Sequence, residues 1–202
     1  NDPPDVSTIT GTPTPLAYDE GDGAVAIDDQ IEVDDPDDTN MEGATVSLSN
    51  YVNGEDFLDF TSAFNITNDG FNSTTGVLSL SGTASLADYQ AALRTVTYEN
   101  LSEAPDLNPR TASFTVTDGD APSSAFGRII NITDSNDPPV NTVPGAQNVG
   151  EDAILTFAGN ISIVDPDAGG DDLTITLSVT NGILDFSTVV GLSAVTDNAA
   201  TI

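Results

Sequence analysis

The tetrapeptide Asn-Asp-Pro-Pro occurs twice in this chain, at Asn1–Pro4 and at Asn136–Pro139, with an offset of 135 residues. The second copy lies within Thr133–Val140, where oxygen-bearing side chains are followed by two prolines. Carboxylate and amide oxygens are ligands for hard cations, and proline stiffens the backbone, so this stretch is predicted to be a linker that can hold an ion. A repeat of this length predicts tandem domains with a metal site at each joint.

The repeat continues beyond the linker. Gly150-Glu151-Asp152 stands in the place of Asp19-Glu20-Gly21, and Ile161–Asp167 stands in the place of Ile31–Asp37. The glutamate lies 15 residues before the first aspartate of Asp-Pro-Asp in the first copy and 14 residues before it in the second. The sequence stops where the first copy had reached about Val77, so the second unit is expected to be incomplete and the chain to be a piece of a longer protein. The expected domains are residues 1–135, with an N-terminal linker, and residues 136–202, with the next linker.

Hydrophobic periodicity predicts an all-β protein. Short runs of Val, Ile, Leu and Phe alternate with polar residues and are separated by Gly, Pro, Asn and Asp. Ser85–Arg94 is the one helical segment, because Ser85 is a suitable cap and Leu86, Tyr89 and Leu93 fall on one face. The predicted strands include Ala44–Asn50, Val77–Leu80, Thr95–Tyr98, Thr111–Thr117 and Phe126–Ile132 in the first unit, and Leu173–Val179 and Ile183–Phe186 in the second.

The charge balance excludes several classes of partner. Asp and Glu number 33 against three arginines, Arg94, Arg110 and Arg128, and the formal net charge is −30. Nucleic acid and anionic membranes are therefore poor partners. The sequence has no run of 18 apolar residues and no basic segment followed by an apolar one, so neither a membrane span nor a signal peptide is expected.

The acids are clustered rather than spread evenly. Eleven of them fall between Asp19 and Glu42, whereas Gly182–Ile202 carries two. Four carboxylates within Asp34–Asp38 repel one another by about 1 kcal/mol per close pair in bulk water, and by several times more at low effective dielectric. A solvating coat of the kind found in halophilic proteins would scatter acids of both types, so the clustering favours cation sites.

A hard divalent cation such as calcium suits this set of residues, because it takes six to eight oxygen ligands from flexible loops. The chain has no histidine and no cysteine, which excludes zinc sites of the usual kinds, Ser-His-Asp arrangements and thiol nucleophiles. Paired carboxylates can hydrolyse glycosides, but these acids lie beside prolines in turns and the chain has no tryptophan to stack on a sugar. We therefore expect no enzymatic activity. Other loop acids are expected to be merely solvated, namely Asp28, Asp29, Asp38, Asp152, Asp171 and Asp172.

These features together resemble cadherin-like repeats, particularly those of giant bacterial surface adhesins and other tandem-repeat extracellular proteins. The resemblance implies an immunoglobulin-like Greek-key β-sandwich in each unit, with calcium between neighbouring units. In cadherins a Leu-Asp-Arg-Glu segment also contributes; here it is missing, Leu86-Ala87-Asp88 stands in its place, and Pro138 replaces the last linker asparagine but still offers a carbonyl oxygen. The ligands implied by the resemblance are Glu20, Asp35, Asp37, Asp118, Asp134, Asn136, Asp137, Glu151, Asp165 and Asp167.

The function that this resemblance implies is mechanical. Calcium would lock the joints of a large secreted or cell-surface adhesion protein, whose partners are the neighbouring repeats of the same chain. One alternative is a module that binds cell-surface polysaccharide or a like adhesin, which would need an exposed aromatic platform near Tyr51, Phe57 and Phe60. Another is a homopolymeric filament or surface layer, in which a neighbouring chain donates the missing strands of the second unit.

Overall fold

The computed structural model describes residues 1–9, 11, 13–157, 159 and 161–185. The fold is all-β, as the sequence predicts: 40% of the described residues are in strands and 4% are in helix. The chain divides into two compact units, Asn1–Asp167 and Ala168–Ile202. The described part of the first unit contains 13 strands and one helix.

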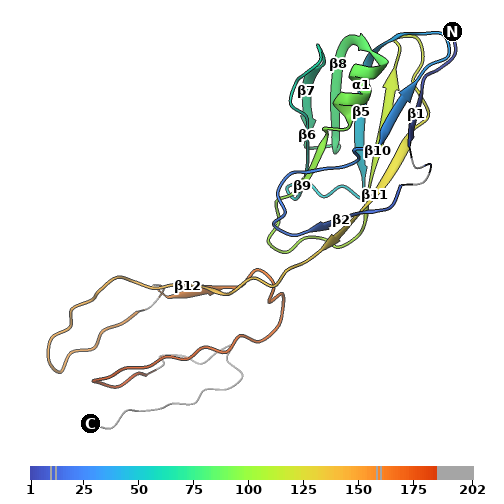
Figure 1. The fold of residues 1–202 in the computed structure, drawn as a ribbon. Coiled ribbons are helices and arrows are strands. Elements are labelled where there is room, and N and C mark those ends of the chain that lie inside the picture. The colour runs from blue at the N-terminus through green and yellow to red at the C-terminus, as the bar shows by residue number, and fades with distance from the viewer. Residues whose placement is uncertain (10, 12, 158, 160, 186–202) are drawn as a thin grey trace. The chain divides into compact units, whose positions relative to one another are not determined.

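A six-stranded sheet forms one layer of a sandwich in the first unit (Figure 1). Its antiparallel centre pairs β10 with β5 and β5 with β8, while β2 runs parallel to β11 at one edge. The strand order is β2 (Leu16–Asp19), β11 (Phe126–Thr133), β10 (Arg110–Thr117), β5 (Asn40–Ser49), β8 (Val77–Ser85) and β7 (Thr67–Asn72).

Two smaller sheets contribute to the same core. One is ordered β3 (Val25–Ala26), β9 (Thr97–Asn100) and β6 (Asp56–Asp59), and the other pairs β1 (Asp5–Thr8) with β4 (Ile31–Asp34). The buried residues of all three sheets form one hydrophobic cluster, to which β10 contributes Phe114, β9 contributes Tyr98 and β4 contributes Ile31. Burying a side chain of this size stabilises the fold by about 1.5–3 kcal/mol relative to leaving it exposed.

The alternation in the sequence explains which side chains face the core. Along β10 every second residue is buried, and a bulge in β5 between Met41 and Gly43 keeps Met41 and Ala44 both buried although they are three residues apart. The predicted strands of the first unit are confirmed, with ends shifted by a few residues. The aromatic residues are distributed differently from the prediction, because Phe60 is buried in the core and cannot belong to an exposed platform.

The helix α1 (Leu86–Leu93) confirms the helical segment. The hydroxyl of Ser85 accepts a hydrogen bond from the backbone N–H of Asp88 at 3.2 Å, which caps the first turn, and Tyr89 and Leu93 are buried. Arg94 extends the connection by donating from Nε to the carbonyl of Ile31 at 2.8 Å. The helix thus crosses over against β4.

The linker repeat is also a structural repeat. In β1 and β4, Asp5 lies opposite Asp34, and in β12 (Val140–Thr142) and β13 (Ser162–Val164), Val140 lies opposite Val164. Val140 follows the second copy of the linker as Asp5 follows the first. Val164 precedes the second Asp-Pro-Asp segment as Asp34 precedes the first. The second copy therefore begins with the same antiparallel pair, in the same register, as the first.

Two strands predicted after Asp167 are not observed. Residues 173–179 form no strand, and neither do residues 183–185, while Phe186 lies outside the described residues. Four apolar side chains of this segment are exposed, namely Leu173 at 42%, Ile175 at 52%, Leu177 at 47% and Ile183 at 76% relative exposure. An alternating pattern forms a stable strand only when other strands or a packed layer cover its apolar face.

Candidate metal centre

Two triads of acidic side chains meet at the linker. Glu20 belongs to both: it lies with Asp134 and Asp167 in one triad and with Glu103 and Asp137 in the other. Within each triad one carboxylate oxygen from each residue lies within 4.8 Å of the others. These five acids are called the linker cluster below.

The strand pair β2 and β11 places Glu20 beside the linker. Because the two strands are parallel and paired up to Asp19 and Thr133, the next residue of each strand stays in contact. The backbone N–H of Glu20 donates to the carbonyl of Thr133 at 3.0 Å, and the backbone N–H of Ser135 donates to Oε2 of Glu20 at 2.9 Å. The linker is therefore attached to the glutamate side chain directly.

The linker also contacts the Asp-Pro-Asp segment of the second copy. The backbone N–H of Asp137 donates to Oδ2 of Asp167, whose own backbone N–H donates to Oδ1 of Asp165 at 3.2 Å. Oδ2 of Asp137 and Oδ1 of Asp167 are buried and accept no hydrogen bond from the described residues. A buried carboxylate oxygen without a donor is costly, so these two atoms fit a cation that binds oxygen.

The negative charges of the linker cluster lie close together, and this raises the pKa of two of its acids. The N–H of Ser135 lowers the pKa of Glu20, but burial and the charges of Asp134 and Asp137 outweigh it, so that this pKa lies above its ordinary value. The carboxyl group of Glu103 meets that of Asp137, and this contact, together with the charge of Asp137, raises the pKa of Glu103. A divalent cation would relieve both effects.

A cavity of about 300 Å³ opens at the second triad. Its lining includes Glu20, Glu103, Asn100, Ser102, Ser135 and Asp137. Acidic and amide groups therefore surround a space that water and an ion can enter.

A second acidic group lies near the N-terminus and is called the N-terminal cluster. Asp35, Asp37 and Asp38 place carboxylate oxygens within 4.8 Å of one another. Oδ1 of Asp35 accepts from the backbone N–H groups of Asp37 at 3.0 Å and Asp38 at 2.8 Å. Asp35 is 8% exposed, and its Oδ2 is buried without a hydrogen-bond partner among the described residues.

The first copy of the linker contacts this N-terminal cluster. The backbone N–H of Asp2 donates to Asp37 at 3.1 Å, and the side-chain amide of Asn1 donates to Asp118 at 3.1 Å and to Asp120 at 3.0 Å. Burial, together with the charges of these neighbouring aspartates, raises the pKa of Asp38. Figure 1 shows the N-terminus at one end of the sandwich, whereas the linker leaves β11 at the other end.

The structure thus divides the predicted ligands into two groups. Glu20, Asp134, Asp137 and Asp167 meet in the linker cluster, and Asp35 and Asp37 meet in the N-terminal cluster, with Asp118 bonded to Asn1 beside them. Asp165 bonds the N–H of Asp167, and the side-chain amide of Asn136 donates to the carbonyl of Asp137 at 3.0 Å. Glu151 is exposed and joins neither cluster in the part of the chain that is described.

One expectation about an individual acid is wrong. Asp28 is not a solvated loop acid, because it is 1% exposed, accepts from the backbone N–H of Gln30 at 2.8 Å and lies 3.5 Å from Arg128. Asp88, which stands in the place of the cadherin Leu-Asp-Arg-Glu segment, is bonded to Ser85 in the first turn of α1 and belongs to neither cluster.

The sequence reasoning missed Glu103, which meets Glu20 and Asp137 in the second triad. Glu103 follows Asn100-Leu101-Ser102 directly after β9, and it is one of seven glutamates in a chain whose acids are mostly aspartate. A search for a glutamate after each strand would have found it. Its contact with Glu20 is visible only in the fold.

Comparison with known proteins gives one relative to report. The chain is 43% identical over 103 residues to Halomucin of Haloquadratum walsbyi, a match that covers 48% of this chain and 1% of Halomucin. No protein-family model matches, and no solved structure matches. The match covers only a small part of Halomucin, and it does not show that this chain belongs to the cadherin family. None of the helices described is long and apolar enough to cross a membrane.

Proposed function

We propose that this chain is a calcium-stabilised structural segment of a large surface or extracellular protein. Calcium in the linker cluster would join Glu20 and Glu103 of the sandwich, Asp134 and Asp137 of the linker, and Asp167 of the second copy. The N-terminal cluster would do the same for the preceding linker. Similarity to Halomucin supports the surface location, and the two clusters support the calcium.

The observation that carries this proposal is the pair of buried oxygens, Oδ2 of Asp137 and Oδ1 of Asp167, that accept no hydrogen bond from the described residues. No arginine supplies the missing positive charge, because Arg110 and Arg128 pair with acids outside the linker cluster and Arg94 bonds the carbonyl of Ile31. Two carboxylates 4 Å apart repel by about 4 kcal/mol at an effective dielectric of 20. A cation bound between them would offset this repulsion.

The donor set favours calcium over other divalent cations. Every candidate ligand is an oxygen, and the five carboxylates come from turns, a loop and the linker rather than from strands. Calcium accepts such irregular sets of six to eight oxygens, whereas magnesium requires a compact octahedron and keeps its waters. Magnesium is therefore the appropriate control ion.

The proposed mechanism is a mechanical lock. An ion bound only by the native state adds RT ln(1 + [L]/Kd) to stability, about 2.7 kcal/mol per site at a hundredfold excess over Kd. Because the linker cluster spans the end of the sandwich, the linker and the Asp-Pro-Asp segment, that free energy would restrain all three together. In a tandem array the same restraint at every joint would convert a flexible chain into a stiff one.

Thermal unfolding with and without calcium tests the proposal. In millimolar calcium we expect a Tm about 10 °C higher than in EDTA, with magnesium much less effective. The double variant Glu20→Gln with Asp137→Asn should lose most of the rise, whereas Asp29→Asn, which removes an exposed acid outside both clusters, should keep it. An identical Tm in calcium and EDTA would defeat the proposal.

Two alternatives stay predictions. For glycan binding, the aromatic platform would have to consist of Phe57, Tyr51 and Phe71. The ring of Phe71 meets that of Phe57 edge to face at 5.2 Å and that of Tyr51 at 5.8 Å. A glycan pull-down tests this alternative. For a filament completed by strand donation, light scattering should show concentration-dependent polymers.

A further inference from the structure

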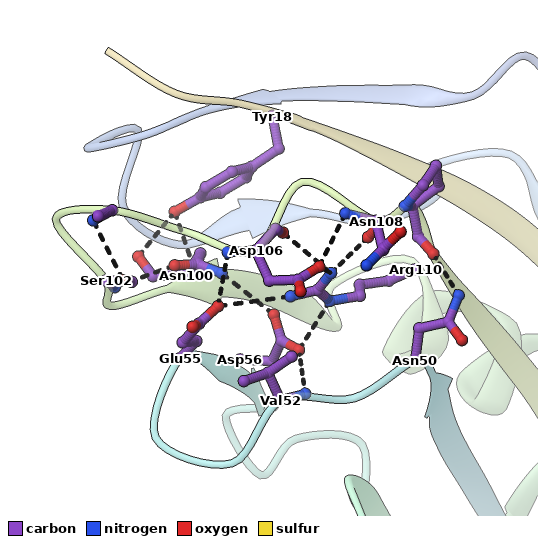
Figure 2. A network of polar contacts seen from close by, with 12 residues as sticks. Tyr18, Asn50, Val52, Glu55, Asp56, Asn100, Ser102, Asp106, Asn108 and Arg110 are labelled. Carbon is purple, nitrogen blue, oxygen red and sulfur yellow. Dashed lines mark hydrogen bonds and ion pairs between the residues drawn. The ribbon is translucent and has the colours of Figure 1, made fainter. Parts of the chain in front are cut away.

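Two acids of the linker cluster, Glu20 and Glu103, follow strands β2 and β9. Hydrogen bonds between two buried residues join these strands. Tyr18 lies in β2 two residues before Glu20, and Asn100 ends β9 three residues before Glu103. The backbone N–H of Asn100 donates to the hydroxyl of Tyr18 at 3.0 Å, and that hydroxyl donates to the carbonyl of Asn100 at 3.4 Å (Figure 2). Both residues are buried.

The side chain of Asn100 extends this link into the loop that carries Glu103. Its Oδ1 accepts from the backbone N–H of Ser102 at 2.9 Å, and its Nδ2 donates to Oδ1 of Asp56 at 3.2 Å. Asp56 also accepts from the hydroxyl of Tyr98 at 2.6 Å. The side chain of Asn100 therefore bonds the start of the loop, at Ser102, and the buried carboxylate of Asp56.

The far end of the loop is held by Arg110, which is fully buried. Its Nε donates to Oδ2 of Asp56 at 2.8 Å, and its Nη1 donates to the carbonyl of Asp106 at 3.0 Å (Figure 2). The backbone N–H of Asp106 in turn donates to Glu55 at 3.0 Å. Glu103 thus lies in a loop anchored at both ends to one carboxylate, that of Asp56.

We propose that Tyr18, Asn100, Asp56 and Arg110 form a positioning network that sets the separation of Glu20 and Glu103 before calcium arrives. The inference rests on the proposed function, since it concerns the same cluster. None of the four residues is among the five acids of the linker cluster. They act through the backbone, by joining the end of β2 to the start and end of the Glu103 loop.

The network preorganises the loop that carries Glu103. A loop that must be ordered on binding costs conformational entropy, and this cost lowers affinity. Here hydrogen bonds from Asn100 and Arg110 hold both ends of the loop that carries Glu103. A buried ionic network is also a poor way to gain stability alone, because apolar residues of similar volume stabilise as well or better. This network joins the segments that carry Glu20 and Glu103. It can therefore hold two acids that repel each other at a fixed separation, which apolar packing would not do.

The test compares two tyrosine-to-phenylalanine variants of the full chain. Tyr18→Phe removes the hydroxyl that bonds Asn100. Tyr89→Phe is the matched control: Tyr89 is equally buried, and its hydroxyl donates to the carbonyl of Gly82 at 2.6 Å, at the helix and away from the linker cluster. Calorimetric titration gives the calcium Kd, and amide hydrogen exchange in EDTA reports the order of residues 101–106 without metal.

We expect calcium binding by Tyr18→Phe to be about tenfold weaker, which corresponds to 1.4 kcal/mol, with faster exchange in residues 101–106. Tyr89→Phe should lower the Tm while leaving both the Kd and the exchange of this loop unchanged. Should Tyr18→Phe fail to fold, Tyr98→Phe removes the bond to Asp56 and leaves the Tyr18–Asn100 pair, with the same expected direction.

The outcomes separate the two proposals. If Tyr18→Phe binds calcium as tightly as the unaltered chain and its loop exchanges no faster, the positioning role is overturned while the calcium site stands. If the unaltered chain itself binds no calcium, the proposed function fails and the positioning role fails with it. Equal losses of affinity in Tyr18→Phe and Tyr89→Phe would also overturn the positioning role, because they would reflect general destabilisation.

Discussion

Asp137 donates its backbone N–H to the carboxylate of Asp167, and Asp2 makes the same bond to Asp37 one repeat earlier. Each bond joins the Asn-Asp-Pro-Pro linker to the Asp-Pro-Asp segment that follows it. Because the bond recurs, we interpret it as a property of the repeat. Each copy of the linker therefore bonds to the Asp-Pro-Asp segment after it in the same way. Glu20, from the sandwich before the second copy, accepts a hydrogen bond from that copy's linker at Ser135.

The repeated bond predicts the effect of substituting its acceptor. Asp167→Asn keeps an oxygen that can accept from Asp137 but removes a charge from the linker cluster. We expect this variant to lose part of the calcium-induced rise in Tm and to be as stable as the unaltered chain, or slightly more stable, in EDTA, where like charges repel. Differential scanning calorimetry in both solutions measures this. A lower Tm in EDTA with an undiminished calcium response would contradict the assignment of Asp167 as a ligand.

The second prediction concerns salt. With a net charge of −30 and all three arginines bonded within the fold, the repulsion among acids is screened only by ions from solution. Raising NaCl from 0.1 M to 1 M shortens the Debye length from about 10 Å to about 3 Å, so the Tm in EDTA should rise by several degrees. Calcium should add a further rise at 1 M NaCl, since buried oxygens are screened little. If calcium adds nothing there, the acids are a solvating coat.

The third prediction concerns Arg110, whose charge is buried against Asp56 at 2.8 Å. Arg110→Met leaves the Asp56 carboxylate buried without its ion partner, so the free energy of unfolding should fall by about 3–5 kcal/mol. Arg94→Met, which removes a bond to a backbone carbonyl, should cost about 1 kcal/mol. Urea unfolding of the two variants in EDTA gives the comparison. Similar losses for both would show that the Asp56 pair contributes no more than an ordinary hydrogen bond.

The fourth prediction concerns alkaline pH. Burial raises the pKa of Tyr89 to about 12, and burial together with the bond to Asp56 also raises the pKa of Tyr98. Because the unfolded pKa is about 10, the folded state holds these protons more tightly, and the stability they contribute is full below pH 10 and lost as pH rises through the folded pKa. Unfolding followed by circular dichroism from pH 9 to 12 should show this decline, and Tyr89→Phe should flatten it. Ionisation of all four tyrosines near pH 10 in the folded chain would contradict it.

Features that depend on neighbouring residues can be predicted from the sequence. Alternation fixed the buried face of β10, Ser85 fixed the start of α1, and the repeated linker fixed the register that β1 with β4 shares with β12 and β13. These signals are local because side-chain direction, capping and turn chemistry are set within a few residues.

Which distant residues meet depends on the tertiary structure. It brought Glu103 to Glu20, buried Phe60, placed Asp28 against Arg128 and left Leu173 exposed without a strand. Each outcome depends on which strands lie side by side and which apolar faces find a cover, and a pattern along the chain contains neither. The acids were visible in the sequence, but their division into two clusters follows from the sandwich, which sends the two copies of the linker to different ends.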